Sequence, residues 1–345
     1  MVLIKKEPSA VVFGCSGPTL TKDEVLFFRE SQPYGFILFS RNIVNPLQLK
    51  NLILELREII GRKNAPILID QEGGSVQRLT SPHWRDPPPV ELFGKLYKNS
   101  RNLGIEACRL NHRIIAAELF ELGINVDCSP VLDVQQIGAN KVIGDRAFSS
   151  EPLIVAELGR AACEGLLEGG VLPVIKHLPG HGRALSDSHA ELPIINTSEK
   201  ELKLVDFKPF QDLASMPWGM TAHIVYSKID KKYPATLSPF IIKNIIRNFI
   251  GFNGLLISDD ICMKALSGNF IKKARKTLDA GCDLVLHCSG DLNEMRETML
   301  GVHELSESAK QRVLMIESSF KKPEQFDIKL ATEKFESLLK TATEI

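Results

Sequence analysis

Short apolar runs rich in β-branched residues recur along this chain and alternate with longer segments of helical period. Such alternation is typical of βα units around a parallel sheet. Eight repeats spread over nearly the whole chain predict a (β/α)8 TIM-type barrel, with a doubly wound sheet as the weaker alternative. The predicted strands are residues 10–15, 36–39, 66–69, 125–128, 172–175, 218–222, 255–258 and 283–286.

The segments between these strands carry recognisable helix ends. Thr21 and Glu24 have the spacing of a capping box, and Asn45–Pro46 and Ser238–Pro239 each combine a capping residue with a proline at the helix start. We expect one domain over residues 1–345, with a barrel core at about 8–305 and a helical C-terminal extension at about 306–345. Further helices are predicted at residues 101–122, 152–167, 201–214, 271–280 and 292–305.

Charge and hydropathy limit the kinds of partner. The chain has 42 Lys plus Arg and 42 Asp plus Glu among 345 residues, so its formal net charge is zero. This balance gives no electrostatic reason to expect nucleic acid or an anionic membrane as a partner. No apolar run suits a signal peptide or a membrane span, and the seven cysteines are spaced singly. We therefore expect a cytoplasmic monomer with buried free thiols.

Polar residues gather immediately after the predicted strands. The loops that lead into the strands, such as 61–65 and 168–171, carry no comparable cluster. One-sided polarity of this kind is what an active site at the C-terminal face of a barrel requires. The alternatives are that Asp70 and Asp259 cap helices and that His223 is a core histidine. The residues after the strands include Asp70, Glu72, Asp133, Asp145, Arg146, Lys176, His177, His223, Asp259, Asp260 and His287.

The stretch 176–193, KHLPGHGRALSDSHAELP, is the densest of these segments in proton-handling side chains. It predicts an active-site loop of a hydrolase. The first alternative is a solvated surface turn. A second is a metal site formed by His177, His181 and His189, although Pro179 and Gly180 prevent the first two from sharing a helix face as zinc ligands would.

The chain lacks the common signatures of metal, phosphate and dinucleotide sites. HExxH, GxxxxGK[ST] and a strand-linked GxGxxG are all absent from the sequence, so we expect no cofactor and no metal. Cleavage of a glycosidic bond needs a carboxylate, a proton donor and groups that bind sugar hydroxyls. The residues after the predicted strands include all of these, which favours a glycosidase over a metal-dependent hydrolase.

The sequence resembles the single-domain bacterial β-N-acetylglucosaminidases of glycoside hydrolase family 3. The matching segments follow one another from about residue 10 to 290, and the combination of KH-PGHG, DSH and SDD is highly specific. They are GFILFSRNI (35–43), IDQEGGSVQRL (69–79), SPVLDV (129–134), VIGDRAFS (142–149), KHLPGHG (176–182), DSH (187–189), MTAHIVY (220–226), LISDD (256–260) and DAGCDLVL (279–286).

The resemblance implies a retaining mechanism in which Asp259 is the nucleophile and His189, oriented by Asp187, is the proton donor. It also implies that five residues bind the N-acetylglucosamine ring: Asp70, Arg78, Arg146, Lys176 and His177. The implied substrates are cell-wall fragments, from which a terminal N-acetylglucosamine is removed. Another sugar specificity and attack by the substrate's own acetamido group remain alternatives.

The sequence departs from the family pattern in places. Leu178 stands where phenylalanine is usual, residues 135–141 are less regular, and ICMKAL follows the SDD motif. None of these changes removes an implied catalytic residue. They bear on which aglycone is accepted.

Overall fold

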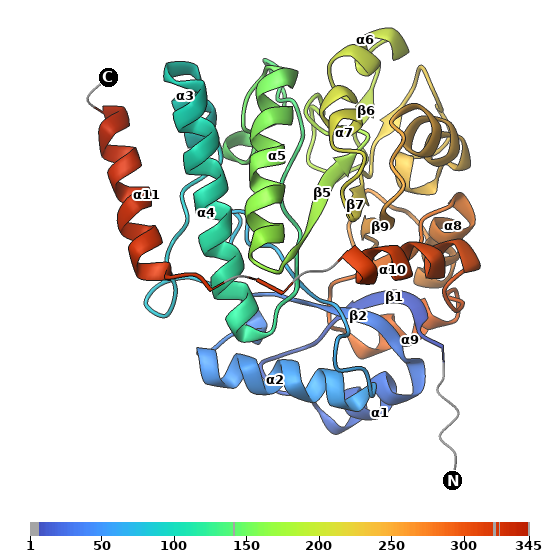
Figure 1. Cartoon of the computed structure of the whole chain (residues 1–345). Coiled ribbons are helices and arrows are strands. Elements are labelled where there is room, and N and C mark those ends of the chain that lie inside the picture. Colours follow the sequence, from blue (N-terminus) through green and yellow to red (C-terminus); the bar gives the residue numbers. More distant parts are fainter. Residues whose placement is uncertain (1–6, 141, 320–321, 324, 344–345) are drawn as a thin grey trace.

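Eight parallel strands close into a barrel in this computed structural model, which describes residues 7–140, 142–319, 322–323 and 325–343 (Figure 1). Around the barrel the strands follow the order β1, β10, β9, β7, β5, β4, β3, β2. The predicted (β/α)8 barrel is therefore confirmed, with a strand at each of the eight expected places. The strands are β1 (Ser9–Gly14), β2 (Pro33–Leu38), β3 (Ile67–Ile69), β4 (Val126–Asp127), β5 (Leu172–Leu178), β7 (Trp218–Thr221), β9 (Leu255–Asp260) and β10 (Leu284–His287).

Three strands, β5, β9 and β10, continue beyond their predicted C-terminal ends, and the first two carry predicted site residues there. β5 continues to Leu178, so Lys176 and His177 lie within the strand and not in the loop after it. β9 continues to Asp260 and includes both carboxylates of the SDD motif. The apolar pattern ends before β5 and β9 do, because side chains near the ends of these two strands line a polar cavity and not the barrel core.

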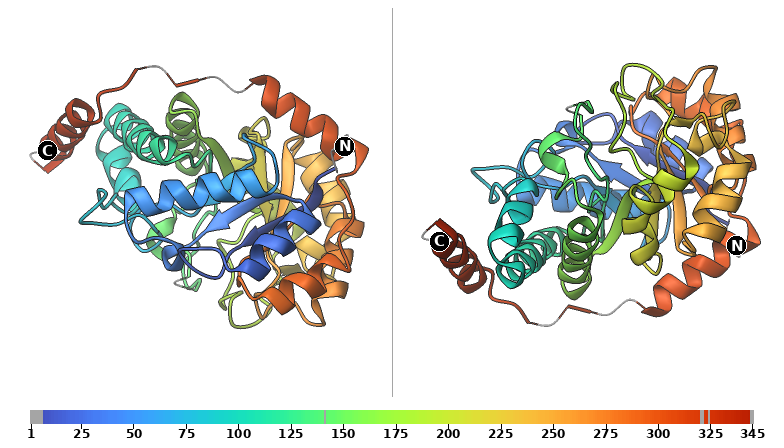
Figure 2. Two further views of the ribbon diagram at one scale, coloured as in Figure 1. Left: turned by 90° about the horizontal axis from the view of Figure 1, so that it is seen from below. Right: turned by 90° about the horizontal axis from the view of Figure 1, so that it is seen from above.

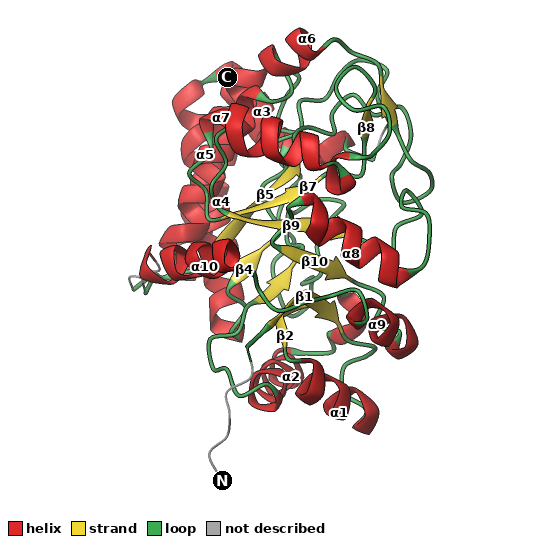
Figure 3. Ribbon diagram, turned by 90° about the vertical axis from the view of Figure 1, so that its right-hand side faces the viewer, coloured by secondary structure: helices red, strands yellow, loops and turns green. Residues whose placement is uncertain are grey.

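Helices surround the strands, and several begin where the sequence predicted (Figure 3). Thr21 and Glu24 form the predicted capping box at α1 (Lys22–Ser31). The side chain of Asn45 accepts from the Gln48 amide at the start of α2 (Pro46–Ile59). The other long barrel helices are α4 (Arg101–Leu122), α5 (Pro152–Glu168) and α8 (Phe270–Ala280), close to their predicted bounds.

Other helix predictions were wrong in part. Residues 201–214 form two short helices, α6 (Glu199–Leu204) and α7 (Lys208–Asp212), because Pro209 cannot donate the helical hydrogen bond and its ring disfavours a continuous helix. α9 (Leu292–Met299) ends before Gly301, where a Cβ would lie 2.2 Å from the Ile271 carbonyl oxygen. Residues Ile241–Phe249 form a π-helix, and α3 (Glu91–Asn99) was not predicted.

The C-terminal residues form two helices on opposite sides of the barrel, as both views in Figure 2 show. They are α10 (Glu307–Ser319) and α11 (Ile328–Thr343). α11 lies against α3 and α4, where the rings of Phe335 and Phe93 are 6.3 Å apart and Lys334 pairs with Glu106 at 2.7 Å. Residues 320–321, 324 and 344–345 of the predicted extension lie outside the described residues.

Two further features complete the described fold. A small parallel sheet joins β6 (Ile194–Ile195) and β8 (Val225–Tyr226), which lie in the connections that follow β5 and β7. Among the described residues, no helix has both the length and the apolar character needed to cross a membrane. All seven cysteines are free thiols, as predicted; five are buried, and Cys262 and Cys288 are partly exposed.

Candidate active site

A cavity of about 150 Å³ lies where the strands end, and the predicted site residues converge on it. Seven of the eight line its wall, although they come from segments spread over 190 residues of the chain. Asp187, the eighth, contacts His189 from outside the wall. The seven that line the cavity are Asp70, Arg78, Arg146, Lys176, His177, His189 and Asp259.

Two carboxylates and three cations form a compact ionic cluster on one side of this cavity. Lys176 Nζ lies 2.9 Å from Asp70 and 2.7 Å from Glu72. Arg78 pairs with Asp70 at 3.1 Å, and Arg146 holds both oxygens of Glu72 at 2.8 Å. The cluster thus fixes the side chains of three segments in one arrangement, with charged donors and acceptors suited to sugar hydroxyls.

The charges of the cluster stabilise one another. Burial works to raise the pKa of Asp70, but the Lys176 and Arg78 charges outweigh it and hold this pKa well below its usual range. Burial likewise works to lower the pKa of Lys176, and Asp70 with Glu72 reverses the effect and raises it. The pKa of Glu72 is likewise lowered against burial, by Arg146 and Lys176. Asp70, Glu72 and Lys176 are therefore all ionised at neutral pH.

Replacing Lys176 by methionine should lower the free energy of unfolding by about 3–5 kcal/mol, because two buried carboxylates lose their shared cation. The lysine side chain is only 3% exposed, so water cannot take over its role. Urea denaturation at neutral pH measures the change. Lys334→Met is the matched control, because its pair with Glu106 is half exposed on both sides and should contribute less than about 1 kcal/mol. Equal losses in the two variants would contradict the proposed stabilising role of the cluster.

Asp133 organises the two histidines at the end of β5. Its Oδ2 lies 2.7 Å from His177 Nδ1, and its Oδ1 accepts from the His181 amide at 2.6 Å. Burial works to raise the pKa of this carboxyl, but the neighbouring His177 outweighs burial and lowers it. Since Asp133 engages Nδ1 of His177, a ligand in the cavity would meet the other ring nitrogen, Nε2.

The two aspartates of the SDD motif have different surroundings, as expected for neighbours on a strand, whose side chains point to opposite faces. Asp260 Oδ1 accepts from the amides of Cys262 and Cys288 at 2.9 and 3.1 Å, so this carboxylate is engaged by the backbone. Asp259 accepts only a local bond, from the Asp260 amide at 2.8 Å, among the described residues. Asp259 is therefore the carboxylate free to act on a ligand, and it caps no helix.

The environment of Asp259 favours its ionised form. Burial works to raise its pKa, but the neighbouring imidazoles of His223 and His177 and the Asp260 amide outweigh it, so the pKa lies below its usual value. His223 is a satisfied core histidine, the alternative named above. Its ring contacts the Asp260 carbonyl oxygen at 3.0 Å and the Thr236 hydroxyl at 2.7 Å.

Asp187 and His189 form a pair on the loop after β5. Oδ1 of Asp187 accepts from the His189 amide and lies 2.8 Å from His189 Nδ1. This geometry fixes the orientation of the ring, as a carboxylate does in other catalytic dyads. The histidine side chain is 65% exposed, so the ring is accessible to solvent as well as to the cavity that it lines.

The 187–189 loop is held at both sides by Ser188. The Ser188 carbonyl accepts from the Ala265 amide at 3.2 Å, which connects this loop to the segment after Asp259. The Ser188 hydroxyl lies 3.2 Å from His181 Nε2, and His181 is itself buried. His181 thus has the contacts of a loop-structuring residue.

The geometry does not support a metal site made of His177, His181 and His189. Within the described part of the chain, the side-chain group close enough to share one ion contains none of these histidines. Glu72 and Asp133, which orient the cations and histidines of the cavity, were not among the predicted site residues. The available signal was their position after predicted strands, in the IDQEGG and SPVLDV segments.

Comparisons with known proteins identify the family of the chain. Residues 21–318 match the glycosyl hydrolase family 3 N terminal domain. A beta-hexosaminidase of Nitrosomonas eutropha is 36% identical over 280 residues, which is 79% of either chain. One of Thiobacillus denitrificans is 37% identical over 261 residues, 74% of this chain and 71% of the relative.

A solved structure shows the same fold over nearly the whole chain. NagZ from Neisseria gonorrhoeae, in complex with N-trifluoroacetyl-D-glucosamine, superposes with a TM-score of 0.84 and 31% identity, covering 97% of both chains. The family match and these relatives cover most of the chain, and the range of the family match includes every site residue described above. The chain therefore belongs to glycosyl hydrolase family 3, among its bacterial β-hexosaminidases.

Proposed function

We propose that the protein is a retaining exo-β-N-acetylglucosaminidase that removes terminal N-acetylglucosamine from peptidoglycan fragments, namely N-acetylglucosaminyl-anhydro-N-acetylmuramyl peptides. The observation that carries the proposal is the placement of Asp259 and His189 on one cavity whose wall also carries the ionic cluster. The N-trifluoroacetyl-D-glucosamine bound by the Neisseria relative supports the choice of sugar.

In the first step, the ionised Asp259 attacks the anomeric carbon and the bond to the leaving oxygen breaks. His189 gives its proton to that oxygen, while Asp187 stabilises the imidazolium beforehand. The product is a covalent glycosyl ester on Asp259 and a free aglycone alcohol.

In the second step, His189, now neutral, takes a proton from a water molecule that attacks the anomeric carbon. The ester bond to Asp259 breaks and the configuration at carbon is retained. Asp70, Arg78, Arg146, Lys176 and His177 hold the sugar hydroxyls and the acetamido group throughout. The ion pairs among these residues keep their positions fixed before the sugar arrives.

An activated 5-fluoro N-acetylglucosaminyl donor tests the covalent step. The fluorine slows breakdown of the ester, so peptide mass spectrometry should find the added sugar on Asp259. A fully active enzyme that remains unlabelled would contradict the covalent mechanism and favour attack by the acetamido group.

The substrate class needs a separate test. Purified protein should release N-acetylglucosamine from N-acetylglucosaminyl-anhydro-N-acetylmuramyl peptides and from an aryl N-acetylglucosaminide, but not glucose from the matched aryl glucoside. Cleavage of the aryl substrate without the muropeptide would show that the natural aglycone is different. We further propose that the enzyme acts as a cytoplasmic monomer, which light scattering and cell fractionation test.

A further inference from the structure

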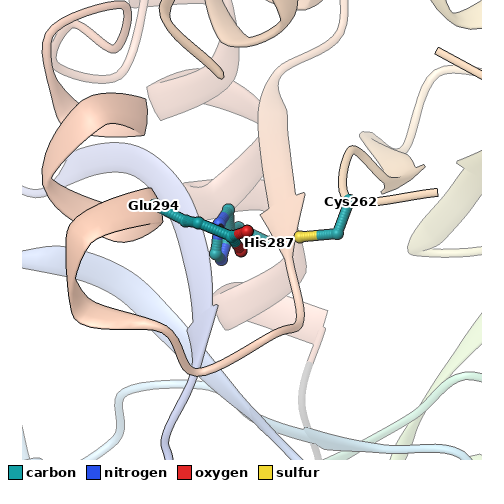
Figure 4. A group of neighbouring side chains, drawn as sticks. All are labelled: Cys262, His287 and Glu294. Atoms are coloured by element: carbon teal, nitrogen blue, oxygen red, sulfur yellow. Dashed lines mark ion pairs between the residues drawn. The ribbon is translucent and has the colours of Figure 1, made fainter. Parts of the chain in front are cut away.

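Three potential metal ligands meet behind the β9 and β10 strand ends, away from the residues assigned to sugar binding. They are Cys262, in the turn after β9, His287, the last residue of β10, and Glu294 on α9 (Figure 4). Their ligand atoms all lie within 4.8 Å of one another. His287 Nε2 and Glu294 Oε2 are 3.8 Å apart, and the Cys262 sulfur points toward them.

His287 is the unusual member of this group. Its side chain is completely buried, and neither ring nitrogen has a hydrogen-bond partner among the residues that the structure describes. The rings of Phe13 and Phe270 pack against it at 5.6 and 5.2 Å, so these two apolar neighbours offer it no hydrogen bond. Buried imidazoles are normally hydrogen-bonded, and an unpaired one calls for an explanation. An ion shared with Cys262 and Glu294 would give one nitrogen its partner.

We propose that Cys262, His287 and Glu294 bind a divalent transition ion of the zinc class, with a water molecule as the fourth ligand. Sulfur, imidazole and carboxylate together suit zinc better than the oxygen-preferring calcium or magnesium. Bond lengths of about 2.0–2.3 Å in a tetrahedron place ligand atoms about 3.3–3.7 Å apart. The pair at 3.8 Å already approaches this spacing, and the sulfur has about 1 Å to move.

The charges around the three ligands are compatible with a cation. On binding, the thiol of Cys262 releases its proton to solvent and its sulfur bonds to the metal. The thiolate and Glu294 then balance the two positive charges. Two cations, Lys273 and Arg41, act on His287. The Lys273 ammonium donates to the Ile261 carbonyl at 2.9 Å, and the Arg41 guanidinium donates to the carbonyls of Cys15 and Cys288, so both cations are occupied. Glu294 also accepts from the Ser289 hydroxyl at 2.6 Å, which orients it as a ligand.

The position of the site suggests a structural role. Cys262 follows Asp259 by three residues, so the ion would tie the turn after the proposed nucleophile to β10 and α9. It does not line the sugar cavity, unlike its neighbour Cys288. The ion would therefore stabilise the fold near the active site and take no part in bond cleavage.

Cobalt provides the decisive probe, because a cobalt–thiolate bond has a charge-transfer absorption that imidazole and carboxylate ligands do not give. Full-length protein is freed of metal with a chelator, passed through a desalting column and titrated with Co²⁺ and then Zn²⁺. We expect a thiolate band that saturates at one Co²⁺ per chain, loss of the band when Zn²⁺ displaces cobalt, and a higher melting temperature with Zn²⁺.

Variants assign the band to the three residues. Cys262→Ser should abolish it and weaken zinc binding at least about tenfold. Glu294→Gln, on a partly exposed helix position, should weaken binding without unfolding the chain, and it keeps the test decisive if His287→Phe does not fold. Cys288→Ser, the matched cysteine control, should retain the band. The proposal would be overturned if wild-type protein gave no thiolate band. It would also be overturned if the band were lost in Cys288→Ser or in His189→Ala, or if it survived in Cys262→Ser. Because glycosidase activity is not the readout, failure here leaves the proposed function intact.

Discussion

Replacing Asp259 by asparagine is expected to lower kcat/KM on an aryl N-acetylglucosaminide by on the order of 10⁴-fold, about 5.5 kcal/mol of barrier. The amide keeps the shape of the side chain but cannot form the glycosyl ester. Its neighbours stay in place, because the only hydrogen bond that this side chain accepts among the described residues comes from the adjacent amide. The melting temperature should therefore change little while activity disappears.

Asp279→Asn is the matched control for this result. Asp279 lies exposed on α8, away from the cavity, so the same chemical change should leave kcat/KM within about twofold. Loss of label and of activity in Asp259→Asn together would support the nucleophile. Substantial activity in Asp259→Asn with the fold intact would transfer the role to another group, such as the substrate's acetamido oxygen.

Replacing His189 by alanine should lower the rate by on the order of 10³-fold on substrates with a poor leaving group, such as a sugar alcohol. Activated aryl glycosides should lose far less in the first step, because a nitrophenolate leaves without a proton. The contrast between the two substrates identifies proton donation, which a merely structural residue would not produce. The measurement is a plot of log kcat/KM against leaving-group pKa, steep in the variant and shallow in the wild type.

His303→Ala controls for histidine loss in general, since the exposed His303 side chain, beyond α9, contacts only the Glu304 carbonyl among the described residues. Its plot should match the wild type. If His189→Ala lost the same factor on every substrate, the histidine would position the loop without donating the proton. Asp187→Asn then separates orientation from charge, because the amide keeps a contact to Nδ1 but removes the negative charge beside the ring.

The fold could be predicted from local patterns because each strand is buried on both faces and therefore reads as a continuous apolar run. Helix starts were predictable because capping residues lie close to one another in sequence, as the Thr21–Glu24 capping box shows. Helix ends were less so. The break before Pro209 follows from the proline itself, which the helical period of the segment does not reflect. The early end of α9 near Gly301 depends on the close approach of the Ile271 carbonyl, and the chain's periodicity carries no record of such a contact.

The active site could be predicted in part. Position after a strand indicated Asp70 and Asp259, since parallel strands bring their ends to one face. Position could not show that Lys176 bridges Asp70 and Glu72, because this contact joins residues about a hundred positions apart. The roles of Asp259, His189 and Asp187 came from resemblance to a family. The grouping of Cys262 with His287 and Glu294 is also a contact between separate segments, and no sequence motif indicates it.

The hydrogen bond from the Ala265 amide to the Ser188 carbonyl has a consequence for engineering and for evolution of this barrel. The segment that carries the proposed acid and the segment that follows the proposed nucleophile share a backbone contact. A change in the length of one loop therefore displaces the other. Exchanging the 187–189 loop between relatives should succeed only when the segment around residue 265 is exchanged with it, so the two behave as one heritable unit.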